Sequence, residues 1–197
     1  MKAEDNRILI TGATGFVGQA LCRHLMLQKG QVVPEGRGGQ QSKEALESPS
    51  SRGLDIQLLI REPSDFSKIP PGLGAGYILG SMQDEASLVA ACSGRNQVIH
   101  LAGFAHAGRG SEQQAVDTNI QGTRNLLDAA IDAGVSRIVY LSSSLAEAAA
   151  SGEGDVTAYG ESKLQAEELL QGASNEGKMD VVILRAVNVY GPGMKGN

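Results

Sequence analysis

The chain has 197 residues, a net charge of −5 and a hydrophobic content of 41%, which suit one globular domain with a sizeable core. The acidic balance disfavours a nucleic-acid partner, and the lack of a long apolar run or leader-like segment predicts a cytoplasmic protein that does not enter a membrane. Two isolated cysteines and three histidines show no metal-ligand spacing, so we expect no metal site.

Strand-like and helix-like patterns alternate along the chain. Short apolar runs bounded by turn residues predict six buried strands: Arg7–Thr11, Asp55–Arg61, Gly76–Gly80, Gln97–Ala102, Arg137–Ser142 and Val181–Val187. Apolar residues at helical spacing predict the intervening helices: Gly15–Lys29, Asp84–Cys92, Glu112–Ala133 and Tyr159–Leu170. This alternation predicts a doubly wound α/β domain, in which helices cover both faces of a parallel sheet.

One stretch does not fit the alternation. Between Pro34 and Gly53 the chain is polar and rich in glycine, serine and glutamine, at a place where a short turn would join the first helix to the second strand. We interpret residues 34–53 as a disordered or loosely held surface insertion.

Three glycines follow the first strand at a spacing of three residues. Gly12 permits a tight turn, Gly15 lets the backbone approach a diphosphate, and Gly18 allows the helix to pack closely on the strand. A purely structural turn is the alternative. The position of the loop, between a strand and a helix at the start of an alternating chain, favours dinucleotide binding.

This segment, Thr11–Gly18 (TGATGFVG), resembles the TGxxGxxG fingerprint of the extended short-chain dehydrogenases/reductases, which include the NAD-dependent epimerases and dehydratases. The resemblance implies a Rossmann-type domain over residues 1–197 with NAD or NADP as cofactor. It also implies that Thr14, Phe16 and Val17 join the three glycines in binding the diphosphate. Val98–Gly103 (VIHLAG) is similar to the family's fourth strand end, which implies cofactor contacts at the residues Leu101, Ala102 and Gly103.

A second motif places a tyrosine and a lysine four residues apart. Tyr159 and Lys163 therefore share one helix face, where the ammonium would lower the pKa of the phenol and prepare it for proton transfer. A surface pair is the alternative, and the position behind a glycine fingerprint and a fifth strand favours a catalytic pair. By resemblance, Tyr159 is the acid/base, Lys163 is the electrostatic helper and ribose ligand, and Ser143 is the catalytic serine, with Ser144 as second choice.

Two further positions bear on the substrate and the cofactor. Arg185–Gly193 (RAVNVYGPG) resembles the RPxNVYGPG segment of nucleotide-sugar enzymes, which implies that Asn188 contacts a substrate diphosphate, although Ala186 replaces the usual proline. Arg61 ends the second strand, where many NAD-selective members carry an acidic residue. It either pairs with the 2′-phosphate of NADP or is a solvated side chain, which leaves the choice of cofactor open.

The resemblance implies a nucleotide-sugar epimerase that inverts C4 of a UDP-sugar by transient oxidation. The alternatives are an NADP(H)-dependent reductase of a keto-sugar or small carbonyl compound, and a non-catalytic NAD(P)-binding subunit or fragment. We expect Glu147–Asp155 to form a loop over the substrate site. We also expect the family's C-terminal substrate lobe to be missing, and a homodimer through the two longest helices.

Overall fold

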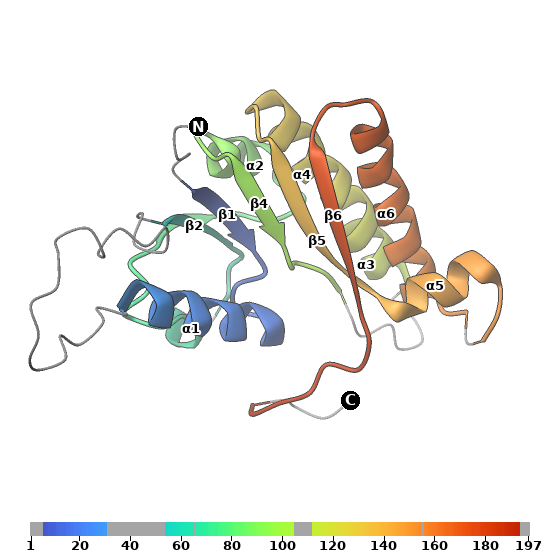
Figure 1. Cartoon of the computed structure of the whole chain (residues 1–197), viewed down its shortest axis with the longest axis horizontal. Coiled ribbons are helices and arrows are strands. Elements are labelled where there is room, and N and C mark those ends of the chain that lie inside the picture. Colours follow the sequence, from blue (N-terminus) through green and yellow to red (C-terminus); the bar gives the residue numbers. More distant parts are fainter. Residues whose placement is uncertain (1–5, 31–53, 65, 105–111, 155, 194–197) are drawn as a thin grey trace, which may run out of the picture.

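The computed structural model describes residues 6–30, 54–64, 66–104, 112–154 and 156–193. At its centre is a parallel six-stranded sheet with the order β3-β2-β1-β4-β5-β6 (Figure 1). The strands are β1 (Arg7–Thr11), β2 (Asp55–Ile60), β3 (Gly76–Leu79), β4 (Gln97–His100), β5 (Arg137–Ser143) and β6 (Asp180–Ala186). All six predicted strands are confirmed, with differences of one or two residues at their ends.

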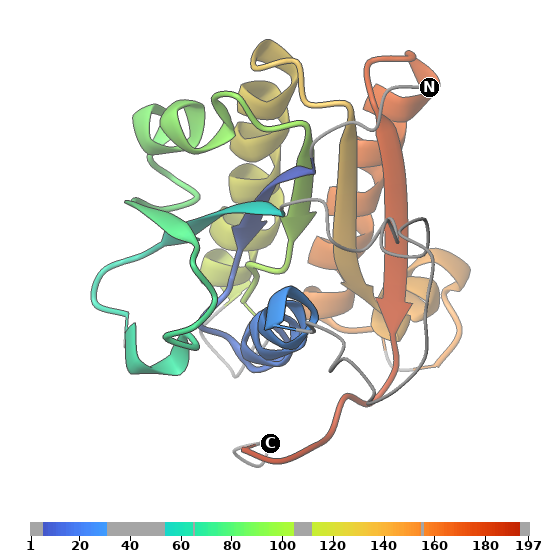
Figure 2. The same ribbon diagram turned by 60° about the vertical axis from the view of Figure 1, so that its left-hand side comes forward.

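Helices cover both faces of the sheet, as predicted for a Rossmann-type domain. They are α1 (Phe16–Gly30), α2 (Glu85–Cys92), α3 (Glu112–Ala115), the π-helical segment η3 (Val116–Gln121), α4 (Gly122–Asp132), α5 (Ser144–Ser151) and α6 (Ala158–Asn175), with a short 3₁₀ turn η2 (Phe66–Lys68). Helix α1 lies on one face, and α2, α4 and α6 lie on the other (Figure 2). The long helix predicted over residues 112–133 is confirmed as the continuous run α3–η3–α4, with a wider π turn in the middle.

Alternating residues of β1 separate the two halves of the core. Ile8 and Ile10 belong to the cluster on the α1 face, whereas Leu9 belongs to the cluster beneath α2, α4 and α6. Because successive side chains of a strand point to opposite faces, one apolar run supplies both layers. Leu126 and Leu127 of α4 are also buried in this second cluster, so these two leucines face the core and not a second subunit.

The expected loop over residues 147–155 is wrong for most of its length. Residues Ser144–Ser151 form helix α5, because the segment SLAEAAAS contains four alanines, the strongest helix former. The Ser143 side chain caps its start by accepting a hydrogen bond from the Leu145 N–H, and Gly152 ends it in the left-handed conformation with a φ of 70°. The chain therefore leaves β5 directly into a helix.

Several predictions concern residues that are not described. The insertion predicted at residues 34–53 lies outside the described residues, and so does Asp155. Within the described part of the chain, none of the helices combines the length and the apolar character that a bilayer crossing requires.

We expect Leu126→Ala to lower the free energy of unfolding by about 2–5 kcal/mol, because the leucine is completely buried between α4 and the sheet. Urea denaturation measures the change. The matched control is Leu27→Ala, since Leu27 is 60% exposed on α1 and its truncation should cost at most roughly 0.5 kcal/mol. Equal losses in the two variants would contradict the assignment of the core.

Candidate active site

The glycine loop after β1 makes a backbone contact with the end of β4. Gly12 has a φ of 73°, and a Cβ atom at this position would lie 2.5 Å from the Ala102 nitrogen and 2.6 Å from the Leu101 carbonyl carbon. A Cβ on Gly18 would overlap the Gly12 carbonyl oxygen, so α1 packs directly on the loop. The tight turn predicted for Gly12 and the close packing predicted for Gly18 are both confirmed as structural features.

A cleft of about 240 Å³ opens at the carboxyl ends of β1 to β4. Its lining brings together residues that are far apart in the sequence: Thr11 at the end of β1 with Gly12, Thr14 and Gly15 after it, Arg61 and Ser64 after β2, Gly80 to Gln83 after β3, and Leu101 to Phe104 after β4, with Leu59 and Thr118. Phe16, Val17 and Gly18 do not line it and instead form the first turn of α1.

The cleft suits a dinucleotide. Gly12 and Gly15 line the cleft, and α1 begins beside them with no acidic residue in its first turn. The unpaired N–H groups and the positive dipole end of a helix N-terminus favour a diphosphate at this place. Thr14 and Gly15 can hold such a group, and Leu101, Ala102 and Gly103 also line the cleft.

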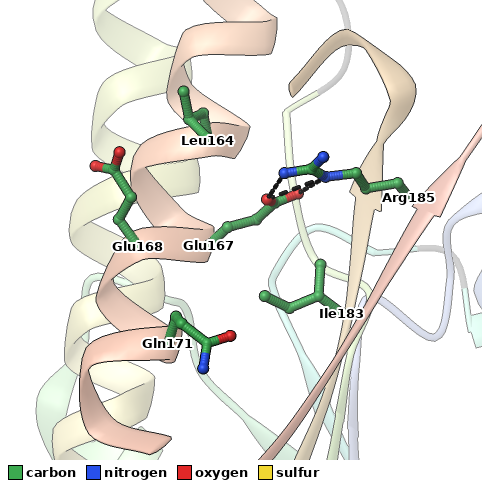
Figure 3. Close-up of a pocket in the computed structure, with 6 residues that line it drawn as sticks. All are labelled: Leu164, Glu167, Glu168, Gln171, Ile183 and Arg185. Carbon is green, nitrogen blue, oxygen red and sulfur yellow. Dashed lines mark hydrogen bonds and ion pairs between the residues drawn. The ribbon is translucent and has the colours of Figure 1, made fainter. Parts of the chain in front are cut away.

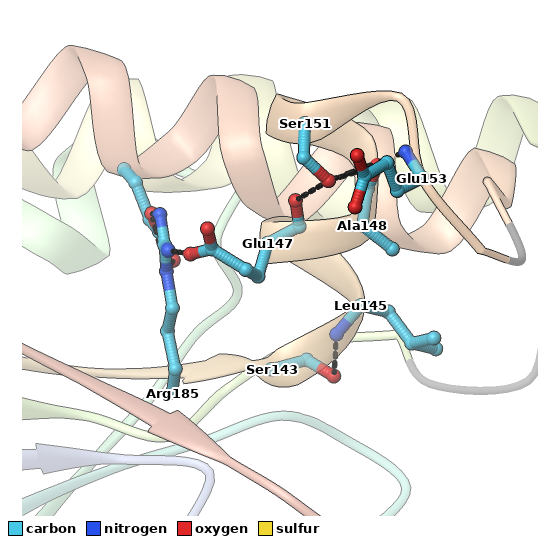
Figure 4. A network of polar contacts seen from close by, with 8 residues as sticks. Ser143, Leu145, Glu147, Ala148, Ser151, Glu153 and Arg185 are labelled. Carbon is cyan, nitrogen blue, oxygen red and sulfur yellow. Dashed lines mark hydrogen bonds and ion pairs between the residues drawn. The ribbon is translucent and has the colours of Figure 1, made fainter.

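Ser143 and Tyr159 come together at the carboxyl end of β5. Against the larger effect of burial, a hydrogen bond with the Ser143 side chain lowers the pKa of the Tyr159 phenol. The Ser143 hydroxyl also accepts a hydrogen bond from the Leu145 N–H at 3.2 Å (Figure 4). Tyr159 lies in the first turn of α6, which begins at residue 158 because the Thr157 side chain caps it. Of the two candidate serines, Ser143 is therefore the one in contact with the tyrosine.

Lys163 lies one helical turn after Tyr159 and is almost completely buried. Its ammonium donates a hydrogen bond of 2.7 Å to the Leu141 carbonyl and lies 4.0 Å from the centre of the Tyr140 ring. Burial lowers the pKa of Lys163 to about 7, and the charge of Glu167 opposes that shift. A Cβ on Gly103 would lie 3.8 Å from the Lys163 nitrogen, so the lysine borders the cleft.

The expected lowering of the tyrosine pKa by Lys163 is wrong for this structure. Burial raises the pKa of Tyr159 above its usual value because it disfavours the phenolate, and the hydrogen bond with Ser143 opposes that effect. The lysine charge is directed to Leu141 and the Tyr140 ring instead. Tyr159 is thus held in its protonated form.

A buried hydrogen-bond chain connects the cleft with α4. His100 Nδ1 lies 2.8 Å from the Thr11 hydroxyl, and His100 Nε2 lies 3.0 Å from the Thr123 hydroxyl. Thr123 donates its own proton to the Asn119 carbonyl, so the Nε2 atom of His100 carries the proton. Burial, followed by the charge of Lys163, lowers the pKa of His100 to about 3 and keeps the imidazole neutral. His100 is a structural residue.

Asn119 joins the end of β4 to helix α6. Its Oδ1 accepts from the Phe104 N–H at 2.8 Å, and its Nδ2 donates to the Phe104 carbonyl at 3.1 Å and to the Ser162 hydroxyl at 2.9 Å. Ser162 in turn donates to the Tyr159 carbonyl at 2.8 Å. The amide therefore sets the position of α6, and with it that of Tyr159, relative to the cleft.

Asn188 is not brought to this site by any contact. It is exposed in the segment after β6 and has no hydrogen-bond partner among the described residues, so its substrate role stays a prediction.

Two residues for which the sequence predicted no role are connected with the active site. Glu167 and Arg185 form an ion pair in a hollow of about 460 Å³ between α6 and β6 (Figure 3). The sequence signal that could have identified Glu167 is its position four residues after Lys163 on α6.

A family model described as "NAD dependent epimerase/dehydratase family" matches residues 8–197. The chain belongs to this family. Its cofactor is NAD or NADP, in agreement with the cleft.

Individual relatives include both epimerases and reductases. The chain is 31% identical over 208 residues to a UDP-glucose 4-epimerase of Vibrio cholerae, an alignment that contains 96% of this chain and 54% of the relative. It is 28% identical to a 2-alkyl-3-oxoalkanoate reductase of Stenotrophomonas maltophilia, over 95% of this chain and 52% of the relative. The structure of Bordetella bronchiseptica WbmG with NAD and UDP matches with a TM-score of 0.69 and 27% identity, over 94% of this chain and 54% of that one. The chain thus spans about half the length of these relatives.

We expect Gly12→Ala to weaken binding of NAD⁺ and NADP⁺ by at least about 100-fold in calorimetric titration, because a methyl group here overlaps the end of β4. Gly172→Ala is the control. A Cβ at this position in α6 meets no atom within 4 Å, so the variant should bind normally and gain about 0.4–1 kcal/mol in stability. Unchanged binding by the Gly12 variant would remove the cleft as the dinucleotide site.

Proposed function

We propose that the protein is a nucleotide-sugar epimerase that inverts C4 of a UDP-sugar. The observation that carries the proposal is the contact of Ser143 with Tyr159, one turn from the buried Lys163 and beside the cleft. The similarity to a UDP-glucose 4-epimerase and to a structure solved with NAD and UDP supports the nucleotide-sugar substrate.

The residues of the chain handle protons and orient the substrate. A bound nicotinamide ring supplies the chemistry of accepting a hydride from the sugar and returning it. As the phenolate, Tyr159 takes the proton of the 4-hydroxyl in the oxidation, and as the phenol it gives the proton back in the reduction, so the phenolate is regenerated after each turnover. Ser143 hydrogen-bonds the sugar oxygen, and Lys163 is the ribose ligand. Asn188 binds the substrate diphosphate.

The raised pKa of Tyr159 has a kinetic consequence. Oxidation of the sugar needs the phenolate, whereas reduction needs the phenol that burial favours. Epimerisation uses both forms in sequence, so the first half-reaction is the one that accelerates as the pH rises toward the pKa of the phenol.

Turnover tests the proposal directly. The chain is incubated with NAD⁺ and UDP-glucose, and formation of UDP-galactose is followed by chromatography. Cofactor binding without turnover would favour a non-catalytic NAD(P)-binding subunit. A homodimer and a cytoplasmic location stay predictions, which sedimentation and fractionation would check.

We expect Tyr159→Phe to lower kcat by about 100- to 10,000-fold while cofactor affinity stays within about twofold, because only the proton-transfer group is lost. The control is Tyr77→Phe, which removes the same hydroxyl from an exposed tyrosine on β3. Full activity of the Tyr159 variant would exclude it as the acid/base.

Reduction of a keto-sugar or small carbonyl compound with NADPH is the second candidate. Arg61 lines the cleft at the end of β2, and a reductase is among the similar proteins. A guanidinium at this place can pair with the 2′-phosphate that distinguishes NADP from NAD.

We expect Arg61→Ala to weaken NADP⁺ binding by about tenfold and to change NAD⁺ binding by less than about twofold in calorimetric titration. Arg124→Ala serves as the control, since Arg124 is an exposed arginine of α4 that does not line the cleft. If neither cofactor is affected, Arg61 is a solvated side chain and the reductase loses its support.

A further inference from the structure

The carboxylate of Glu167 is buried on the same helix that carries the tyrosine and the lysine. Its side chain is only 6% exposed, and it follows Lys163 by four residues, so the two side chains lie on one face of α6. A buried carboxylate is unfavourable unless it is paired. Because Glu167 comes four residues after Lys163, that lysine would be its direct partner.

Arg185 of β6 is the partner instead. Its Nε atom donates to both carboxylate oxygens of Glu167, at 3.1 and 3.2 Å, and its Nη2 donates to Oε2 at 2.7 Å (Figure 3). The fork orients the carboxylate more rigidly than a single contact would. Lys163 makes no ion pair with Glu167 in this structure, and its ammonium is left to the Leu141 carbonyl and the Tyr140 ring.

The same arginine also reaches the helix that follows the catalytic serine. Arg185 contacts the Glu147 carboxylate of α5, whose first residue comes directly after Ser143 (Figure 4). In the sheet, Arg185 pairs with Ser142, and the next residue pairs with Ser143. One guanidinium therefore joins β6, α6 and α5 around the group that we assign to proton transfer.

We propose that Arg185 and Glu167 are positioning residues: Arg185 holds the Glu167 carboxylate away from Lys163, so that Glu167 keeps the ammonium charged without capturing it. This inference rests on the proposed function for its catalytic meaning. The effect of Glu167 and Arg185 on the pKa of Lys163 can be tested without measuring turnover.

Among the groups around Lys163, Glu167 is the anion that affects the pKa of the lysine. The titratable neighbours are His100 on β4, Tyr140 on β5 and Tyr159 on α6, and all three are neutral near pH 7 because burial disfavours their charged forms. On η3 the adjacent side chain is the uncharged Asn119, and on β6 it is Arg185, which is already paired. Burial alone lowers the pKa of Lys163, and Glu167 raises it again to about 7.

The two substitutions predict opposite effects. Glu167→Gln removes the anion, so the pKa of Lys163 should fall by about one, a tenfold weaker hold on the proton. Arg185→Met frees the carboxylate to pair directly with Lys163, so that pKa should rise by a similar amount. An ion pair that is purely structural, with charges that do not act on Lys163, would lower stability in both variants and leave the pKa of Lys163 unchanged.

The experiment is an NMR titration of the full chain labelled with [¹³Cε]lysine, in which the Lys163 signal is assigned by its loss in Lys163→Arg. Wild type, Glu167→Gln and Arg185→Met are compared with Glu168→Gln, which removes an exposed carboxylate one residue away and should change the pKa of Lys163 by less than about 0.3. The double variant Glu167→Gln/Arg185→Met leaves no buried unpaired charge and should titrate like Glu167→Gln. It replaces Arg185→Met if that variant does not fold.

The proposal is overturned if Glu167→Gln leaves the titration of Lys163 unchanged, if both single variants shift it in the same direction, or if the folded double variant titrates like wild type.

The corresponding kinetic measurement is the pH dependence of kcat, in which the alkaline limb reports the loss of the Lys163 proton. A lysine that loses its proton more easily moves this limb to lower pH, so Glu167→Gln should lose about tenfold of the wild-type activity at pH 9 but only about twofold at pH 6. If the pKa of Lys163 shifts as predicted but the chain shows no turnover, the role of Glu167 and Arg185 is supported and the epimerase function is contradicted. If the chain shows turnover but the pKa of Lys163 does not shift in the variants, the epimerase function is supported and the role of Glu167 and Arg185 is contradicted.

Discussion

The contact between the backbone at Gly12 and the backbone at Ala102 is the constraint on which the rest of the site depends. It brings the turn after β1 against the end of β4, and α1 can pack on this turn only because Gly18 also lacks a side chain. The cleft, the helix N-terminus that faces it and the position of Gly103 beside Lys163 all follow from that approach. Steric exclusion acts here first, and the electrostatics of the helix dipole act on a geometry that glycine has made available.

A second layer of constraint consists of polar groups that are buried and paired. Asn119 connects Phe104 with Ser162, and the neutral His100 connects Thr11 with Thr123, so the end of β4 cannot move independently of α4 or α6. Buried polar groups are costly when unpaired, and satisfied networks of this kind select one arrangement of the elements around them. The proton-transfer group is therefore placed by hydrogen bonds well outside the cleft.

Local patterns in the sequence predicted much of this structure. The apolar runs and their turn residues predicted every strand of the sheet, because a buried parallel strand needs apolar residues on both of its faces. Ser143 was selected by counting from β5, and the structure places its hydroxyl against Tyr159. Helix α5 was missed, since a loop was inferred from a family pattern although the alanines and the capping serine favour a helix.

The sequence by itself determined the alternation of strands and helices, the glycine turn and the tyrosine–lysine spacing, because each depends on residues that are near one another in the chain. Only the tertiary structure decided the ionisation of those groups and their partners. The pKa values of Tyr159 and Lys163 are set by burial, and the partner of Glu167 comes from β6, eighteen residues further along. Desolvation and long-range pairing depend on which surfaces meet in the folded chain, and no short pattern of residues encodes that.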